Sequence, residues 1–288
     1  MQIIESLEEM GEVCRIARQE GRLVGLIPTM GAFHEGHLSL MRESRKRDQV
    51  VIVSLFVNPM QFGPGEDYGT YPRDMEGDSA KASAIGADYL FVPSAGALYP
   101  NGYSTYVLVQ GLSDKLCGAF RPGHFRGVTT IVCKLFHITL PNRAYFGQKD
   151  AQQTILMGRM IADLNWDVEL VILPTVREKD GLALSSRNAY LNPQQRGEAT
   201  ILFQSLCWAE EEIRRGERDA RKIRAEMIEM ISFMKTARID YVATVDPASL
   251  EEVSQVEGKV LIALAVWFGE ARLIDNLMVE PKGALRDR

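Results

Sequence analysis

The sequence has 288 residues, enough for one large or two medium domains with a real core. Its hydrophobic content of 46%, charged content of 25% and net charge of −5 are those of an ordinary globular protein, and they argue against binding to nucleic acid or to an anionic membrane. The four cysteines form no CxxC pair, the N-terminus is acidic, and no apolar run approaches the ~18 residues of a membrane span, so we expect a cytoplasmic protein with reduced thiols.

Strand-like and helix-like segments alternate through the first part of the chain. Helical spacing of apolar residues predicts helices over 7–19, from near Gly36 onward, and over 74–85, 128–140 and 151–163. Apolar runs predict strands over 22–27, 50–57, 88–92, 103–110, 143–146 and 166–173. This alternation indicates an α/β fold, with a Rossmann-like parallel sheet in an N-terminal domain over 1–180.

The pattern changes after about Val176. Two charged helices are predicted over 193–215 and 219–235, followed by strands over 239–245, 259–268 and 272–279. A helix pair followed by consecutive strands is typical of an α+β domain with antiparallel pairing. We therefore predict a smaller α+β C-terminal domain over 181–288, acting as a lid.

The segment 27–41 carries the strongest functional pattern. A strand meets a Gly-containing turn and then a helix, and such a helix N-terminus directs backbone N–H groups at an anion above the end of the strand. His34 and His37 lie at the start of this helix, where imidazoles can donate to phosphoryl oxygens. This H-x-G-H pattern resembles the signature of the nucleotidyltransferase superfamily.

Two further segments carry polar groups suited to a small substrate. Asn58 and Gln61 follow a strand, where their neutral amides can bond hydroxyls and carbonyls, although Asn, Pro and Gly are also ordinary turn residues. His124 lies in a second cationic segment, directly before the helix predicted from Val128. Its neighbours Arg121 and Arg126 are equally well explained as surface charges.

The remaining two segments suit a nucleotide. Lys149 can neutralise phosphate charge and Asp150 can accept bonds from ribose hydroxyls, although Asp150 also fits a plain helix cap. Further on, Ser185 and Ser186 followed by Arg187 suit the β- and γ-phosphates.

Together these segments resemble the pantoate–β-alanine ligase family over nearly the whole chain. The matching motifs are Pro-Thr-Met-Gly-Ala-Phe-His-Glu-Gly-His (28–37), Asn-Pro-Met-Gln-Phe (58–62), Arg-Pro-Gly-His-Phe (121–125), Phe-Gly-Gln-Lys-Asp-Ala-Gln-Gln (146–153) and Asp-Gly-Leu-Ala-Leu-Ser-Ser-Arg-Asn (180–188). The resemblance implies ATP-dependent ligation of pantoate and β-alanine through a pantoyl-adenylate, with Mg²⁺ required. It also implies a nucleotide-binding domain with a small C-terminal domain, and a homodimer. The resemblance does not identify the dimer interface, for which the strand predicted over 103–110 and the helix predicted over 128–140 are the candidates.

The resemblance assigns roles to individual positions. It implies ATP binding by Thr29, Met30, His34, His37, Gly147, Lys149, Asp150, Val176, Ser185, Ser186 and Arg187. It implies pantoate and β-alanine binding by Asn58, Gln61, His124 and Gln153. It implies catalytic roles for His34, His37, Lys149 and Arg187. Gln148 and Ala151 depart from the family's usual Glu and aromatic residue, and no carboxylate cluster suggests ligands for the metal.

Two alternatives stay open at this point. One is another nucleotidyltransferase, such as a cytidylyltransferase or part of an aminoacyl-tRNA synthetase. A synthetase would need a Lys-rich second signature where this chain has 183–187, and a basic face for tRNA. The other alternative is a nucleotide sensor that binds without turnover.

Overall fold

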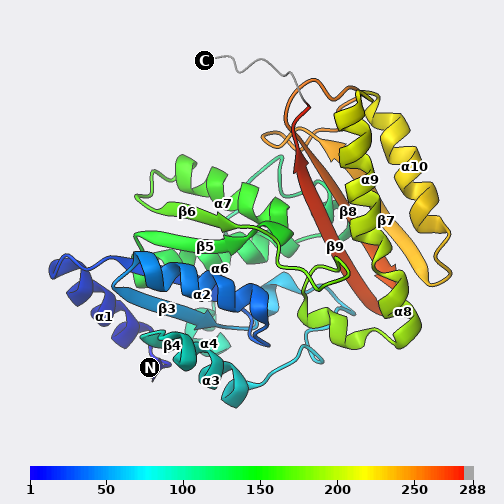
Figure 1. Ribbon diagram of the computed structural model, residues 1–288. Helices are drawn as coiled ribbons and strands as arrows, with labels where there is room; N and C mark the ends of the chain where they lie inside the picture. Colours follow the sequence, from blue (N-terminus) through cyan, green and yellow to red (C-terminus); the bar gives the residue numbers. More distant parts are fainter. Residues whose placement is uncertain (282–288) are drawn as a thin grey trace. The chain divides into compact units, whose positions relative to one another are not determined.

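A computed structural model describes residues 1–281, which form two compact units (Figure 1). The first contains residues 1–114, 121–148 and 152–174. The second contains residues 115–120 and 149–151 and the chain from Thr175 onward. The sequence-based division into 1–180 and 181–288 stays a prediction, and its residues 282–288 lie outside the described part.

A six-stranded parallel sheet forms the centre of the first unit, in the order β1-β4-β3-β2-β5-β6. The strands are β1 (Gln2–Ile4), β2 (Val24–Thr29), β3 (Val50–Leu55), β4 (Tyr89–Phe91), β5 (Arg143–Gly147) and β6 (Glu169–Leu173). The central strand β3, Val-Val-Ile-Val-Ser-Leu, is buried over nearly its whole length. Such continuous apolar strands are typical of a parallel sheet covered on both faces, which confirms the predicted α/β class.

Helices cover both faces of this sheet. They are α1 (Leu7–Gln19), α2 (Glu35–Arg47), α3 (Met75–Ile85), α4 (Ala95–Leu98), α6 (His124–Thr139) and α7 (Ala151–Asp163), with the short helix η1 (Pro59–Gln61) after β3. Helix α2 packs with α3, and α1 packs with α6. Figure 1 shows α2 in front of the strands and α6 behind them. The core beneath α2 and α3 includes Ile27, Met41, Val53 and Leu90.

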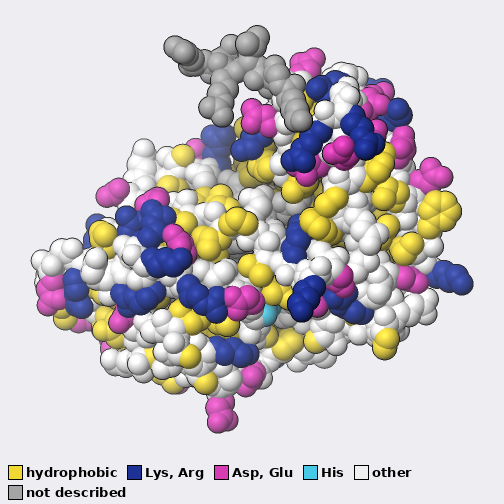
Figure 2. All heavy atoms as spheres, in the orientation of Figure 1, with side chains coloured by type: hydrophobic (Ala, Val, Ile, Leu, Met, Phe, Trp, Pro, Cys, Tyr) yellow, Lys and Arg dark blue, Asp and Glu magenta, His cyan; other side chains and the backbone are white. Residues whose placement is uncertain are grey.

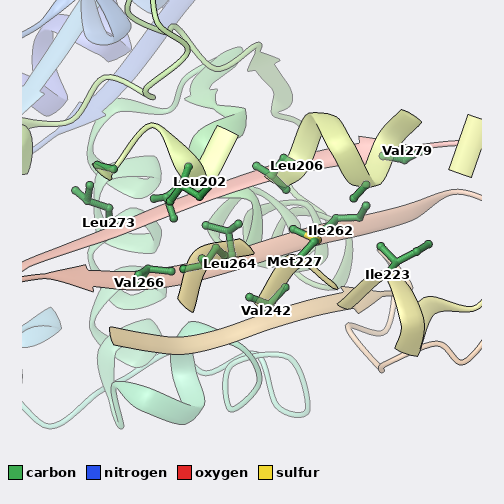
Figure 3. Packing of buried hydrophobic residues seen from close by; sticks show 14 of the residues in the cluster. Leu202, Leu206, Ile223, Met227, Val242, Ile262, Leu264, Val266, Leu273 and Val279 are labelled. Carbon is green, nitrogen blue, oxygen red and sulfur yellow. The ribbon is translucent and has the colours of Figure 1, made fainter. Parts of the chain in front are cut away.

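The second unit packs helices on one face of an antiparallel sheet with the order β7-β8-β9. Its elements are α5 (Cys117–Phe120), η2 (Gln148–Asp150, of which Lys149 and Asp150 belong here), η3 (Ser186–Tyr190), α8 (Pro193–Glu198), α9 (Ile201–Arg215), α10 (Ala220–Ser232), β7 (Ala237–Val245), β8 (Val260–Phe268) and β9 (Ala271–Val279). In Figure 3, Leu206 of α9 and Met227 of α10 meet Ile262 and Leu264 of β8. The predicted antiparallel α+β character is confirmed.

The surface carries both signs of charge. On the exposed side of α9, Arg214 pairs with Glu210 and Arg215 pairs with Glu211, each one helical turn away. Figure 2 shows acidic and basic side chains interspersed over the face in view. Among residues 1–281, no helix is both long enough and apolar enough to cross a bilayer.

Three sequence-based predictions of elements are wrong. Residues 103–110 are extended but form no strand, because Val107 bonds side chains of α6: its N–H donates to Thr130 Oγ1 (3.0 Å) and its carbonyl accepts from Thr129 Oγ1 (2.6 Å). Helix α6 begins at His124 instead of Val128, so Gly127 lies inside it. The helix predicted over 193–215 is two helices, α8 and α9.

Candidate active site

The chain changes direction across the sheet between β2 and β5. From β2 it proceeds through β3 to β4 on one side, and from β5 it proceeds to β6 on the other. Such a switch point leaves a crevice at the carboxyl ends of the two strands, where ligands of open α/β sheets bind. The His34–His37 segment follows β2 directly, and Gly147 is the last residue of β5.

The two imidazoles cap helix α2 in a reciprocal arrangement. His34 is the N-cap residue, and its Nδ1 accepts from the backbone N–H of Gly36 (3.1 Å). His37 Nδ1 accepts from the backbone N–H of His34 (3.4 Å). Since both Nδ1 atoms act as acceptors, each neutral ring carries its proton on Nε2. The rings lie 4.2 Å apart between centroids, so the helix N-terminus presents two Nε2–H donors together.

Gly36 allows the His34 ring to lie against the helix. A Cβ at this position would stand 2.8 Å from Cε1 and 2.9 Å from Nδ1 of His34. Both distances are well inside van der Waals contact. The glycine of the H-x-G-H pattern is therefore the residue that leaves room for the ring.

Asp78 of α3 anchors the turn that leads into these histidines. Its carboxylate accepts from the backbone N–H groups of Ala32 (2.7 Å) and Phe33 (2.6 Å), while Lys81 Nζ donates to the Phe33 carbonyl (2.9 Å). Burial raises the pKa of Asp78, and the two backbone bonds oppose that shift without cancelling it. The sequence analysis did not predict a role for Asp78. The pattern that could have indicated one is an acidic side chain one helical turn before the buried Ala82, on the same face of α3.

The amides of Asn58 and Gln61 are oriented by a closed network. Asn58 Oδ1 accepts from Met60 N (3.2 Å) and Tyr99 OH (2.9 Å), and its Nδ2 donates to Gln61 Oε1 (3.1 Å) and Gly127 O (3.0 Å). Asn58 is only 1% exposed. Because Gln61 Oε1 accepts from Asn58, its Nε2 is left to donate, here to Met30 Sδ (3.1 Å). Gln61 therefore presents a donor beside the turn after β2.

His124 holds the same segment from the other side. Its Nδ1 lies 2.8 Å from the Gln61 carbonyl, which can only accept, and its Nε2 lies 3.1 Å from Arg121 Nη1, which can only donate. These contacts suit a ring whose Nδ1 donates to the Gln61 carbonyl and whose Nε2 accepts from Arg121. Arg121 also forms a two-pronged ion pair with Glu66 (2.7 and 2.6 Å). Burial would raise the Glu66 pKa, but the Arg121 hydrogen bond and charge hold it below the usual value.

Three further predicted residues of the first unit lie near strand or helix ends. Thr29, the last residue of β2, is buried, and its Oγ1 donates to the Ser54 carbonyl (2.6 Å). Met30 follows it and receives the Gln61 bond described above. Gln153 lies in the first turn of α7 and is half-buried.

In the second unit, residues 176–188 form a tight loop. Leu184 N donates to the Val176 carbonyl (3.0 Å), and Arg177 bridges antiparallel to Ala183. Ser185 then caps η3, its Oγ accepting from the backbone N–H of Arg187 (3.3 Å). The loop therefore brings Val176 close to the predicted phosphate-binding residues, with Ser186 and Arg187 as the first residues of η3.

Lys149 and Asp150 also belong to the second unit. They lie in η2, with Asp150 exposed and Lys149 half-buried. The Lys149 carbonyl accepts from Asn276 Nδ2 of β9 (2.8 Å). This contact ties the segment to a strand far away in the sequence.

Among the described residues, the acidic and imidazole groups do not assemble a metal site of their own. Within residues 1–281, no three His, Cys, Asp or Glu side chains come together in an arrangement that could hold a metal ion. Lys149 and Arg187 are donors and cannot serve as metal ligands. A magnesium ion held by these residues would therefore take most of its ligands from elsewhere, as Mg²⁺ does when it binds together with substrate phosphates.

Comparison with known proteins identifies the family. Residues 2–278 match the family model described as pantoate-beta-alanine ligase. The chain is 54% identical to a pantothenate synthetase of Acetivibrio thermocellus over 280 residues, covering 97% of this chain and 100% of that one. It is 53% identical over 281 residues to a pantothenate synthetase of Thermodesulfovibrio yellowstonii, with coverage of 97% and 100%.

Solved structures agree with this match. The crystal structure of pantothenate synthetase from Thermus thermophilus superposes with a TM-score of 0.91 at 43% identity, covering 98% of this chain and 100% of that one. A pantoate-beta-alanine ligase from Francisella tularensis, complexed with beta-gamma ATP and beta-alanine, gives a TM-score of 0.79 at 32% identity, with coverage of 96% and 97%. The chain therefore belongs to the pantoate–β-alanine ligase family.

Proposed function

We propose that the protein joins pantoate to β-alanine in the cytoplasm, using ATP and releasing AMP and pyrophosphate. The family match supports the choice of substrates. The structural observation that carries the proposal is the pair of Nε2-protonated imidazoles at the N-terminus of α2, at the switch point of a parallel sheet. Oriented donors at a helix N-terminus suit a phosphate chain on which negative charge develops.

In the first step, a carboxylate oxygen of pantoate attacks the α-phosphorus of ATP. The bond from the α-phosphorus to the bridging oxygen breaks, and pyrophosphate leaves with that electron pair. His34 and His37 donate to phosphate oxygens, and the cations of Lys149 and Arg187 stabilise the departing charge. Catalysis then rests on positioning and electrostatics, as in other phosphoryl and nucleotidyl transfers.

The other predicted nucleotide contacts are assigned along the ATP molecule. Thr29 and Met30 border the phosphates after β2, Met30 through its backbone amide. Gly147 and Asp150 bind the ribose, and Ser185 and Ser186 bind the β- and γ-phosphates. Val176 binds adenine through its backbone, using its N–H or the second lone pair of its carbonyl, since that carbonyl already accepts from Leu184.

Gln61 and Gln153 hold pantoate, with Gln61 donating from Nε2. Asn58 and Gln61 border the β-alanine position. Asn58 is buried and its amide is engaged, so it contributes mainly by fixing Gln61. His124 contributes to substrate binding in the same indirect way, because its bond to the Gln61 carbonyl fixes the position of Gln61.

In the second step, the amine of β-alanine attacks the acyl carbon of pantoyl-adenylate. The acyl–oxygen bond breaks, AMP leaves with that electron pair, and the nitrogen loses a proton to form the amide of pantothenate. We expect Mg²⁺ to enter with ATP, coordinated chiefly by phosphate oxygens, which are the ligands that this ion prefers.

An omission assay tests the reaction. We expect AMP to form only when ATP, Mg²⁺, pantoate and β-alanine are all present, with pantothenate formed in equal amount. Turnover with CTP would support a cytidylyltransferase, and activation of an amino acid would support a synthetase fragment. ATP binding without turnover under any of these conditions would support a nucleotide sensor.

The His37→Ala variant tests the role of the imidazole pair. Removing one oriented donor is expected to lower the rate of adenylate formation by a factor on the order of 10². Pyrophosphate release in a single turnover measures that step. A rate within a few-fold of wild type would exclude His37 from the chemistry.

We also propose that the protein is a homodimer whose interface includes residues 103–110. Tyr106 and Leu108 are 41% and 52% exposed there, although both are large hydrophobic residues. Their segment packs along α6, where Arg126 lies over the Tyr106 ring. The mass in solution, measured by light scattering, is expected to be twice that of one chain and to halve for Leu108→Asp. A monomeric wild-type protein would contradict the proposal.

A further inference from the structure

Two adjacent polar residues are buried in the middle of β9. Asp275 is 3% exposed and Asn276 is 4% exposed, between apolar residues that belong to the core of the second unit. Successive side chains of a strand point to opposite faces of its sheet, and β9 pairs with β8 without a register shift. Asp275 and Asn276 therefore reach opposite faces from positions about 3.3 Å apart along the strand.

On one face, Asp275 holds Arg177. Its two oxygens accept from Arg177 Nη1 (2.6 Å) and Nη2 (2.9 Å), the two-pronged geometry that fixes a guanidinium most firmly. Arg177 Nη1 also donates to the Gly181 carbonyl (3.1 Å), and its guanidinium lies 4.0 Å from the centre of the Phe203 ring. Arg177 is thus fixed from several sides, and with it the backbone of its neighbour Val176.

On the other face, Asn276 holds Lys149. Its Nδ2 donates to the Lys149 carbonyl (2.8 Å). Residues 149–151 belong to the second unit, although their neighbours Gln148 and Gln152 belong to the first. The backbone of Lys149 is therefore located by β9 within the second unit.

We propose that Asp275 and Asn276 are positioning residues for ATP, setting the spacing between the adenine-binding segment at Val176 and the phosphate-binding segment at Lys149. This inference rests on the proposed nucleotide contacts of those two segments. Neither residue touches ATP. Because both emerge from adjacent positions of one strand, a change at either shifts one segment relative to the other.

The burial of the pair supports this role. A buried carboxylate or amide costs free energy unless it is fully hydrogen-bonded, and an apolar residue would pack the middle of a strand at no such cost. The polar pair is instead bonded to two segments that lie 98 and 127 residues away in the sequence. Those are the segments whose relative position a bound nucleotide would require to be fixed.

Two variants of similar size test the proposal. Asn276→Asp replaces the donor with an oxygen that faces the Lys149 carbonyl, and Asp275→Asn removes the charge that holds Arg177. Losing one buried bond of this kind is expected to weaken binding of a non-hydrolysable ATP analogue about 5- to 100-fold, measured by calorimetry. The KM for ATP should rise in parallel, while the KM for pantoate changes less than about twofold.

Asp240→Asn is the matched control. Asp240 is an acid on β7 of the same sheet whose side chain is 8% exposed. It is bonded to Arg272 Nε (2.7 Å) and Trp267 Nε1 (3.0 Å), and it holds neither predicted nucleotide segment. It should lower the melting temperature without changing affinity for the analogue. An equal loss of affinity in this control would make the effect general destabilisation and would overturn the positioning role.

The outcomes separate the two proposals. If the wild-type protein does not bind the analogue, the proposed function fails. If it binds and both β9 variants bind within about twofold of it, the positioning role fails while the function stands. Asn276→Ser, which shortens the side chain without adding charge, replaces Asn276→Asp if that variant does not fold, and the same loss of affinity is required of it.

Discussion

The backbone around His34 and His37 determines which ring nitrogen of each imidazole carries the proton. Each Nδ1 accepts an N–H group at the start of α2, so each proton lies on Nε2. The first N–H groups of a helix have no partners within the helix, so side chains accept them and cap the helix. Here the same bonds fix the tautomer of the two histidines. The H-x-G-H pattern is a helix cap and a pair of oriented donors in one.

Substituting Gly36 tests whether the position of the His34 ring matters for activity. In Gly36→Ala, the new methyl group would displace the His34 ring, while helix propensity gains up to about 1 kcal/mol. We expect stability to change by less than about 2 kcal/mol, because the gain in helix propensity opposes the loss of the His34 cap. Turnover should fall by about tenfold or more, because an oriented donor has moved. Urea denaturation and steady-state rates measure the two effects.

Gly197→Ala provides the control for Gly36→Ala. Gly197 lies in α8, and no atom would come within 4 Å of a Cβ there. This variant should leave turnover unchanged. Full activity of Gly36→Ala would show that the position of the His34 ring is unimportant.

The Glu66–Arg121 pair predicts a pH effect on stability. The Glu66 pKa is lower in the folded protein than its ordinary value of 4.5, so the pair stabilises the fold above that pH and ceases to do so as the pH falls through the folded-state pKa. The difference in unfolding free energy between wild type and Glu66→Gln should be about 1–2 kcal/mol at pH 7 and shrink toward zero below pH 4.5.

Denaturation by urea at several pH values measures this difference. Glu5→Gln, at an exposed position of the same unit, controls for the general titration of acidic residues. A difference between wild type and Glu66→Gln that stays constant down to pH 3 would contradict the assigned role of the ion pair.

At the scale of elements, the site depends on the contact between η1 and α6. The Gly127 position on α6 is so close to η1 that a Cβ would stand 2.3 Å from the Met60 carbonyl oxygen and 2.6 Å from Gln61 N. The Gly127 carbonyl in turn accepts from Asn58 Nδ2. The glycine therefore sets how closely the segment that carries the Asn58 and Gln61 amides approaches the helix.

Gly127→Ala should separate η1 from α6, because backbone atoms cannot rotate away from the added methyl group. We expect a stability loss of about 1–3 kcal/mol, typical of overpacking, and a rise in the KM for pantoate of about tenfold or more. Gly158→Ala on α7, where the nearest atom would lie at an ordinary 3.7 Å, is the control. An unchanged KM for pantoate in folded Gly127→Ala would show that η1 does not position the substrate.

Periodicity predicted most elements because burial on a fixed face leaves a regular pattern of apolar residues. Periodicity gave a wrong prediction where the backbone of one segment bonds to side chains of another element. Residues 103–110 have the apolar character of a strand, but their partners are hydroxyl groups of α6. Likewise α6 begins at His124, before its apolar stripe, because Gly123 supplies the left-handed conformation that starts the helix.

At the scale of the whole chain, sequence reasoning predicted the segments of the candidate site but not their anchors. His34, Gln61 and Lys149 follow strands or strand-like runs. Ligands of parallel sheets bind beyond the ends of strands, so the position of these residues in the sequence is enough to make them candidates. Asp78 and Asn276 lie inside regular elements and bond backbone groups that only the fold brings to them. No local pattern encodes such a long-range contact.

The two units have separate hydrophobic cores, so a cavity in one should loosen that unit first. Met227→Ala removes a side chain with 0% exposure from the core of the second unit, and Leu90→Ala does the same in the first. Each truncation is expected to cost about 2–5 kcal/mol.

Amide hydrogen exchange followed by mass spectrometry measures where that cost falls. In Met227→Ala, exchange should accelerate in α9, α10 and β7–β9 while α2 and β2–β4 keep their protection, and Leu90→Ala should give the reverse pattern. Equal acceleration of both sets by either variant would mean that the units unfold as one. We expect each variant to affect only its own unit, because each core buries apolar surface locally. A cavity removes van der Waals contacts only from the side chains that line it.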